Sequence, residues 1–412
     1  MLFYFSKRGD RMSEKQRFTA QEKRIFSGCF ICYMLCYVAR MNLAGALPHV
    51  TQAFSLTDAQ AGLIQTVFAV VYAAGQLING LIVDHISPRR HVVIGLLGSA
   101  LCNLLVGCSN TYWQILVLWG LNGVAQSMLW TPMVRLIAVW FDSKKRSVVS
   151  FWMCVCFIIG HLLAWAVSGL MAARFSWRTS FFAPAAVLVF ATSVALYTLR
   201  DRTKEHSDDK AHVSPMPIRE MLFGTGLWLI FLGCIATGFA RDGVMTWAPT
   251  LIGALFSSQN ASSGVIISLI IPLLNLMGLL LGQFLLRRSN GNLRPTICRL
   301  LIAAAICTLL LAVFHALPAF LFTLLLGILC GLMYSVSNMQ NVILPLEYAD
   351  TGRVSLIAGI ADSMIYIGTS LVSVISGLLM QSVGQSAVYI SWGIAAMISC
   401  TLTMLAGRTA KQ

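Results

Sequence analysis

Charged side chains are scarce in this sequence. Only 11% of the 412 residues are charged, whereas 58% are hydrophobic, and the mean hydropathy is +0.78. Those proportions exclude a soluble globular domain and a disordered chain. They indicate a membrane protein, in which the unit to count is an apolar span of about 20 residues.

Residue patterns that carry metal, nucleotide or catalytic chemistry are also missing. The 12 cysteines lie almost entirely inside apolar runs, and no Cys or His pair stands in a polar loop as a zinc site requires. We expect packing cysteines, no disulfide framework and no metal. The sequence has no Gly-x4-Gly-Lys-(Ser/Thr) loop for nucleotide phosphates and no nucleophile, base and metal in combination. We therefore expect neither a cofactor nor an enzyme.

The segment before the first apolar run is basic. It lacks a small-residue cleavage site, so no cleavable signal peptide is expected, and whether Met1 or Met12 is the true start stays open. The run from Thr19 to Glu22 has the pattern of a capping box, which predicts the start of a helix there.

Twelve apolar segments follow, and together they predict an all-α membrane protein with twelve transmembrane helices. They lie at 25–50, 60–83, 91–109, 112–140, 147–171, 179–199, 225–252, 262–286, 295–314, 318–346, 353–380 and 385–405. The longest join is charged and divides the chain six plus six. The expected parts are an N-terminal segment 1–24, a six-helix bundle 25–199, a central loop 200–222, a second bundle 223–405 and a tail 406–412.

The basic residues predict the orientation. Of the 29 Lys and Arg, 23 fall at the termini or in the joins on the same side, two (Arg174 and Arg178) fall on the other side, and four fall within spans. The positive-inside rule then places both termini in the cytoplasm. The net charge of +14 is thereby explained by topology and contact with the lipid bilayer, and no nucleic-acid partner is expected.

Two arginines occupy matched places in the two halves. Arg40 lies inside the first span and Arg241 inside the seventh, and each is followed eight residues later by a proline, Pro48 or Pro249. A guanidinium stays charged and is costly at the bilayer centre, so it marks a functional site. The matched pair predicts two halves of one anion site in a transporter built from a duplicated unit.

A motif after the second span points to a known superfamily. Gly80, Asp84, Arg89 and Arg90 stand at the spacing Gly-x3-Asp-x4-Arg-Arg, which resembles the cytoplasmic motif of the major facilitator superfamily, with His85 and Ser87-Pro88 as departures. The glycine would let two helices approach, and the carboxylate would pair across the cytoplasmic seam as a gate. A degenerate copy, Gly282 with Arg287 and Arg288, follows the eighth span.

Three further segments resemble the organophosphate:phosphate antiporter family, which includes the glycerol-3-phosphate and hexose-6-phosphate transporters. They are Tyr33, Tyr37, Arg40 and Asn42 in the first span, Trp130 to Phe141 in the fourth, and Arg241 to Pro249 in the seventh. The resemblance implies a major facilitator fold of two six-helix bundles, with Arg40 and Arg241 clamping a phosphate. It also implies these further cavity positions: Tyr33, Tyr37, Tyr72, Gln76, Trp130 and Tyr366. Related organic-anion symporters share the first-span pattern.

The chain departs from that family at several basic positions. Met41, Gln76 and Cys156 stand where the family has a basic residue, a lysine and a histidine. Two acids, Asp242 and Asp362, lie within the spans, and we expect them to serve coupling or charge balance. Because they offset the positive charge of the arginines, a doubly charged phosphate ester would be compensated less well. Asp242 is about 100° around the helix from Arg241, so we expect it to pair with another helix. We expect a hydrogen-bonded, neutral role for His161 and an anchoring role for Arg135.

The predicted function is exchange of a small organic anion, such as a sugar or polyol phosphate, for inorganic phosphate by alternating access. The alternatives are a proton- or cation-coupled symporter of organic anions and a membrane sensor of sugar phosphate. We expect a monomer in a bacterial inner membrane. The exact substrate, the direction of net flux and the oligomeric state stay open.

Overall fold

The computed structural model of the chain describes residues 18–83, 86–201, 216–253, 270–314 and 317–409, and all regular elements among them are helical. The elements, in chain order, are α1 Ala20–Phe54, α2 Asp58–Ile82, α3 Pro88–Gly107, α4 Tyr112–Trp140, α5 Ser143–Arg174, α6 Thr179–Thr198, η3 Glu220–Gly224, α7 Leu227–Gly253, α9 Ile270–Arg288, α10 Leu293–Val313, α11 Ala319–Asn338, η5 Met339–Ile343, α12 Leu344–Glu347, η6 Ala349–Thr351, α13 Val354–Ser382 and α14 Gln385–Thr409.

The prediction of twelve helical spans is confirmed. Each predicted span contains a long helix, with α11, η5 and α12 forming the tenth as one continuous segment. Ten helices in the described part are long and apolar enough to cross a membrane. α4 is not among these ten; its span carries the polar residues Asn122 and Gln126, and both are buried. The eighth span, predicted at 262–286, is described only from Ile270 onward.

Capping residues, rather than hydrophobicity, determine where several helices begin. The capping box of Thr19 and Glu22 predicted from the sequence is present, and equivalent boxes start α2 at Thr57 and α4 at Thr111. α1 is therefore longer than its apolar run, since the hydrogen-bonding needs of its first turn are met outside the apolar segment. Glu22 also pairs with Lys145 at 2.9 Å, which ties α1 to α5.

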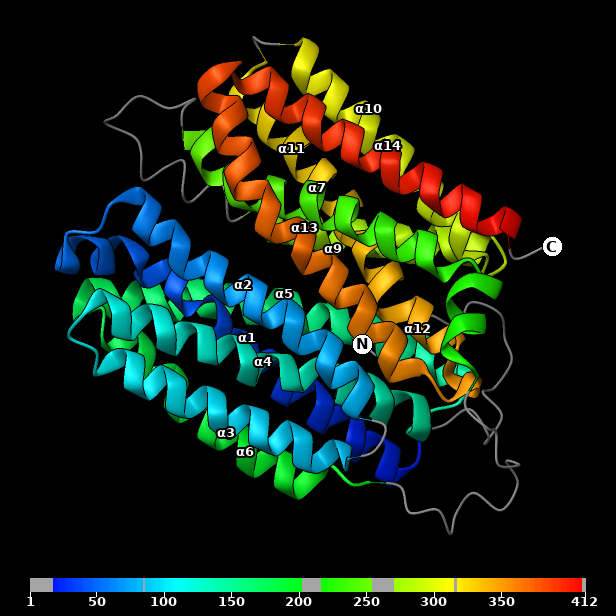
Figure 1. Cartoon of the computed structure of the whole chain (residues 1–412), viewed down its shortest axis with the longest axis horizontal. Helices are drawn as coiled ribbons and strands as arrows, with labels where there is room; N and C mark the ends of the chain where they lie inside the picture. The colour runs from blue at the N-terminus through cyan, green and yellow to red at the C-terminus, as the bar shows by residue number, and fades with distance from the viewer. Residues whose placement is uncertain (1–17, 84–85, 202–215, 254–269, 315–316, 410–412) are drawn as a thin grey trace.

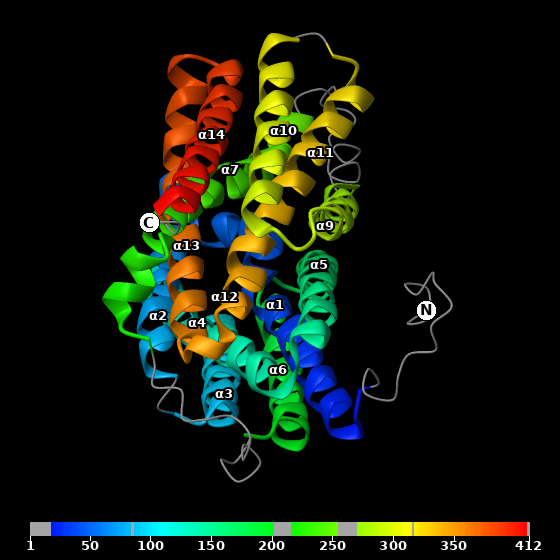
Figure 2. The same ribbon diagram turned by 90° about the vertical axis from the view of Figure 1, so that its right-hand side faces the viewer.

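The helices form two bundles that lie side by side (Figures 1 and 2). In the first, α1 packs against α5 and α6, and α3 against α4 and α6; in the second, α7 packs against α13 and α14, and α10 against α11 and α14. α3 with α6, and α10 with α14, lie at the two outer edges (Figure 1). The bundles meet chiefly along α13, which packs against α2 and α4, and to a smaller extent along α5 with α9.

The bundles are joined by a hydrophobic core at one end of the molecule. That core combines residues of α1, α3, α4, α5 and α6 with Leu279, Val342, Leu346, Val354 and Ala358 of the second bundle. It lies toward the end where α1 begins and α14 ends, on the right in Figure 1. We call this the terminal end. The structure is therefore closed there.

Two glycines allow the backbones of α2 and α13 to touch within this contact. A Cβ added at Gly359 would lie 2.6 Å from the carbonyl oxygen of Gln76 and 2.8 Å from the Cα of Gly80. Both distances are shorter than side chains tolerate. Gly80 thus lies at a close backbone contact between α2 and α13.

Replacing one of these glycines should loosen the terminal end. In Gly359→Ala the added methyl group has to push α2 and α13 apart, which costs about 1–3 kcal/mol as other overpacked contacts do. We expect Cys154, buried where α5 meets Asn338, to react with a maleimide at least about fivefold faster. Site-resolved mass spectrometry measures that rate. Gly62→Ala is the matched control, because a Cβ at Gly62 meets nothing within 4 Å. Equal rates in both variants would refute the proposed role of this contact.

Candidate functional site

Arg40 lies buried between the bundles and is enclosed by aromatic rings. It is 3% exposed. Its Nε donates to Oε1 of Gln126 at 3.2 Å and its Nη1 to the hydroxyl of Tyr366 at 3.3 Å. Its Cζ lies 4.7 Å from the ring centroid of Tyr37 and 4.6 Å from that of Tyr72. Such cation–π contacts stabilise a guanidinium that has lost its water.

One donor of this guanidinium remains unused. Nη2 of Arg40 is buried and has no hydrogen-bond partner among the described residues. A buried donor without a partner costs about 1–3 kcal/mol, and more when it is charged. Gln126, which orients Arg40, is itself fixed by bonds to Ser99 and to the carbonyl of Cys36. A rigidly held cation with a free donor is suited to bind an anion.

Arg241 is engaged quite differently. Its Nε and Nη2 form a forked pair with the two carboxylate oxygens of Asp242, at 2.6 and 2.7 Å. Its Nη1 donates to Ser337 at 2.7 Å, and its Cζ lies 6.0 Å from the ring of Tyr334. The hydroxyl of Thr369 on α13 also donates to Asp242. The second guanidinium is therefore already occupied by an internal carboxylate.

The expectation that Asp242 forms its ion pair with another helix is wrong. Although neighbouring residues diverge by about 100° at the helix surface, the long side chain of Arg241 spans that separation and reaches both oxygens of Asp242. Among the described residues, the hydrogen bond that Asp242 receives from another helix is the one from Thr369 on α13.

Asp362 stands at the centre of a hydrogen-bond chain between the bundles. Its carboxylate accepts from the Tyr72 hydroxyl at 3.0 Å and from Nδ2 of Asn341 at 2.6 Å. Gln76 donates to the Tyr72 hydroxyl at 2.6 Å, and Trp130 donates to Oδ1 of Asn341 at 3.1 Å. The chain joins α2 and α4 of the first bundle to η5 and α13 of the second. Asp362 has hydrogen-bond donors but no cationic side chain in contact within the described part.

Tyr366 lies between Arg40 and the hydrogen-bond chain of Asp362. It accepts the hydrogen bond from Arg40, and its ring centroid lies 4.3 Å from that of Tyr72. The Tyr72 hydroxyl in turn donates to Asp362, so a line of contacts leads from Arg40 to that carboxylate. We therefore treat these residues as one buried, mixed-charge site between the bundles.

Other residues expected in the cavity pack within the first bundle instead. The ring centroid of Tyr33 lies 5.1 Å from that of Trp130 and 5.0 Å from that of Phe157. Asn42 donates to Asn103 and to the carbonyl of Ser180, all within the first bundle. Of these residues, Tyr33 also lies next to Arg40, whose Cζ is 5.9 Å from its ring centroid.

Two residues that the sequence assigned structural roles have the contacts expected of them. Nδ1 of His161 lies 3.0 Å from the carbonyl of Phe157, and its ring packs on Tyr37 at 4.8 Å. Arg135 donates to the carbonyls of Val83 and Ile86, beside the loop after α2.

The four gate residues divide between the seam and one bundle. Gly80 contacts Gly359 across the seam, whereas Asp84 lies outside the described residues. Arg89 binds the carbonyl of Leu196 on α6 at 2.5 Å, within its own bundle, and Arg90 is exposed at the start of α3. No described contact carries either arginine across the seam.

Sequence reasoning missed the partners that hold the charged groups. They are Gln126, Tyr334, Ser337, Asn341 and Thr369. A signal was available, because polar residues inside apolar spans are costly and mark function, and the run 338–341 holds Asn, Gln and Asn. η5 is a π-helical turn in that run, and such turns occur frequently at functional sites.

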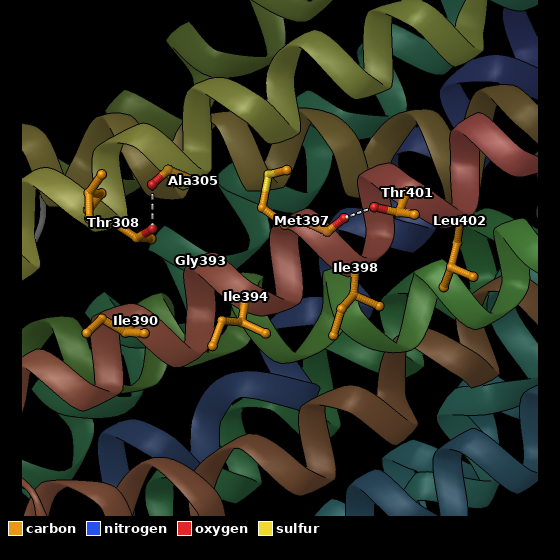
Figure 3. Close-up of a pocket in the computed structure, with 10 residues that line it drawn as sticks. Ala305, Thr308, Ile390, Gly393, Ile394, Met397, Ile398, Thr401 and Leu402 are labelled. Carbon is orange, nitrogen blue, oxygen red and sulfur yellow. Dashed lines mark hydrogen bonds between the residues drawn. The ribbon is translucent and has the colours of Figure 1, made fainter.

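A surface groove of about 600 Å³ between α10 and α14 is a poor candidate for an anion site (Figure 3). Its lining is almost wholly apolar. The hydroxyls of Thr308 and Thr401 donate to the carbonyls of Ala305 and Met397 in their own helices. The groove therefore offers no unused donor. Within the described part, no three His, Cys, Asp or Glu side chains are grouped so as to hold a metal.

The fold matches one known class of membrane protein. The family description "Major Facilitator Superfamily" matches residues 29–368, and the chain belongs to that superfamily. The structure of the transporter FucP in its outward conformation has the same fold: the TM-score is 0.69 at 15% identity, over 92% of this chain and 98% of that one.

The chain is also similar to curated phosphate-ester transporters. It is 28% identical to the glycerol-3-phosphate transporter of Bacillus subtilis, over 56% of this chain and 57% of that protein. It is 27% identical to a probable hexose phosphate transport protein of Chlamydia trachomatis, over 45% and 41%. A third relative, the membrane sensor protein UhpC of Salmonella typhimurium, is 25% identical over 47% and 44%.

The matched region spans about half the length of these curated relatives. The relatives confirm the resemblance to the organophosphate transporters that the first, fourth and seventh spans indicated. They are named as transporters or a sensor, not as enzymes.

Proposed function

We propose that this protein carries a small organic anion of the phosphate-ester class across a membrane by alternating access. The observation that supports this most is the buried Arg40, whose Nη2 has no partner among the described residues and which is matched by Arg241 at the same place in the other half of the chain. Guanidinium groups match tetrahedral oxyanions because they donate two parallel hydrogen bonds. The named substrates of the relatives, glycerol 3-phosphate and hexose phosphate, belong to this class.

The closed terminal end supports alternating access. By the positive-inside rule we assign this end to the cytoplasm, and by the bacterial relatives we assign the protein to a bacterial inner membrane. The described state then faces outward. The chain through Tyr72, Asp362 and Asn341 spans both bundles, so it has to break when the terminal end opens.

We expect exchange rather than one-way transport. One anion can replace another at Arg40, so the guanidinium is never left without a counter-charge. Proteoliposomes loaded with inorganic phosphate test this against empty ones. Uptake of radiolabelled glycerol 3-phosphate only with internal phosphate supports exchange. Uptake that requires a proton gradient instead supports the symport of organic anions.

In this proposal Asp362 balances the positive charge of the site. A neutral variant tests that role. Asp362→Asn removes a negative charge near Arg40 while keeping the side-chain volume. We expect exchange to continue and competitive inhibition by phosphate to strengthen about fivefold, equivalent to roughly 1 kcal/mol. Inhibition constants measured in proteoliposomes test this. Loss of gradient-driven accumulation with exchange intact would instead make Asp362 the proton carrier and favour the symporter.

A sensor of sugar phosphate is the second candidate, supported by the similarity to UhpC. Such a protein would bind the ligand through the same arginines. Purified protein that is stabilised by phosphate esters in a thermal-shift measurement, yet gives no uptake under either gradient, would support it.

A further inference from the structure

A second basic site lies at the terminal end, apart from the arginines between the bundles. Arg24 near the start of α1, Arg89 at the start of α3 and Arg200 just after α6 line a cavity of about 620 Å³ together with Leu196, Tyr197 and Asp201. Three segments far apart in the chain thus bring three guanidinium groups to one place.

Asp201 forms no ion pair with these three guanidinium groups in the part of the chain that the structure describes. Its carboxylate accepts hydrogen bonds from the backbone amide of Arg89 at 3.1 Å and from the hydroxyl of Ser87. It therefore caps the N-terminus of α3, whose dipole it offsets. Three positive charges share the cavity with one carboxylate that is already in use.

The guanidinium groups retain unused donors. Arg24 stacks 4.1 Å from the ring centroid of Tyr197 and donates to its carbonyl, and Arg89 donates to the carbonyl of Leu196. The Nε atoms of Arg24 and Arg89 are nevertheless buried and without a partner in the described part. The side chain of Arg200 makes no hydrogen bond to any described residue. A tetrahedral oxyanion would satisfy these donors.

The position of the cavity indicates the source of that oxyanion. α3 and α6 form the outer edge of the first bundle (Figures 1 and 2). At the rim of the cavity Leu196 is 50% exposed and Tyr197 is 72% exposed. An exposed apolar and aromatic rim at the end of a membrane helix lies at the level of the lipid headgroups. The cavity is thus open toward lipid and not toward the space between the bundles.

We propose that this cavity binds the phosphate headgroup of an anionic phospholipid, whose acyl chains lie along the exposed faces of α3 and α6. Each basic residue near a membrane surface contributes about 1 kcal/mol to such binding. A bound headgroup would join α1, α3 and α6 at the terminal end.

Native mass spectrometry of the full-length protein with phosphatidylglycerol or phosphatidylcholine tests the proposal. We expect Arg200→Gln to weaken phosphatidylglycerol binding about fivefold and Arg200→Lys to recover much of it, since the charge returns. Arg200 is the residue to change because Arg24 and Arg89 also bind α6. Arg288 is an exposed arginine in the last turn of α9 on the same end; Arg288→Gln is the matched control and should bind lipid as the wild type does.

Three results would overturn the proposal. They are equal affinity for phosphatidylcholine, unchanged binding in Arg200→Gln, and an equal loss in Arg288→Gln. Glycerol 3-phosphate and inorganic phosphate, which lack acyl chains, distinguish the source. If either alone displaces the lipid at an equal concentration and depends on Arg200, the cavity binds free phosphate and not lipid.

Discussion

Arg40→Lys is expected to lower the transport rate roughly 100-fold or more while the protein remains folded. Arginine here makes two hydrogen bonds, stacks between two tyrosines and still presents a free Nη2. A lysine keeps the charge but has a single nitrogen, which cannot reach Gln126, Tyr366 and a ligand together. The loss of two charge-assisted hydrogen bonds, each about 1.5–3 kcal/mol, corresponds to that factor. Initial uptake rates in proteoliposomes measure it.

Arg178→Lys is the matched control for this change. Arg178 also donates to several oxygens, those of Gly107, Ser109 and Asn110, and stacks 4.6 Å from the ring of Trp177, but it lies outside the site. It should transport as the wild type does. Arg241→Lys should be milder than Arg40→Lys, by about tenfold, because Asp242 already occupies the fork. Wild-type rates in Arg40→Lys would refute the proposed anion site.

The fold could be predicted from the sequence because its causes are local. Apolar runs of about 20 residues require helices in a membrane, and the capping box at Thr19 marks the first helix start. The location of Arg40 and Arg241 could be predicted for a similar reason, since a charge inside an apolar run has to be buried against another polar group.

The engagement of each arginine could not be predicted, because it depends on contacts between distant helices. The partners of Arg40 come from α4 and α13, at sequence separations of 86 and 326 residues. The pairing of Arg241 with Asp242 depends on side-chain torsions, which helix periodicity does not fix. The π-helical turn at Met339–Ile343, which carries Asn341, has no pattern of its own in the hydropathy.

These contacts make the two arginines unequal as anion ligands. Arg40 offers a free donor, whereas Arg241 shares its charge with Asp242 and gives it up only if an anion displaces that carboxylate. At the proposed site a monoanion would find its counter-charge at Arg40 alone. A dianion would need both guanidinium groups and would therefore compete with Asp242. We infer that Asp242 sets the preference of the site between singly and doubly charged phosphate.

Asp242→Asn should reverse that preference. Asparagine keeps an acceptor for Arg241 and for Thr369 but removes the competing charge, so dianionic phosphate is expected to bind roughly tenfold more tightly. Inorganic phosphate changes from a mainly singly charged to a mainly doubly charged ion between pH 6 and pH 8, near the second phosphate pKa. The gain in competitive inhibition should therefore be large at pH 8 and small at pH 6. Asp142→Asn, which removes a charge at the cap of α5 and keeps a good capping residue, controls for overall charge and should show no gain. An equal gain at both pH values, or none at all, would mean that Asp242 does not compete with the substrate for Arg241.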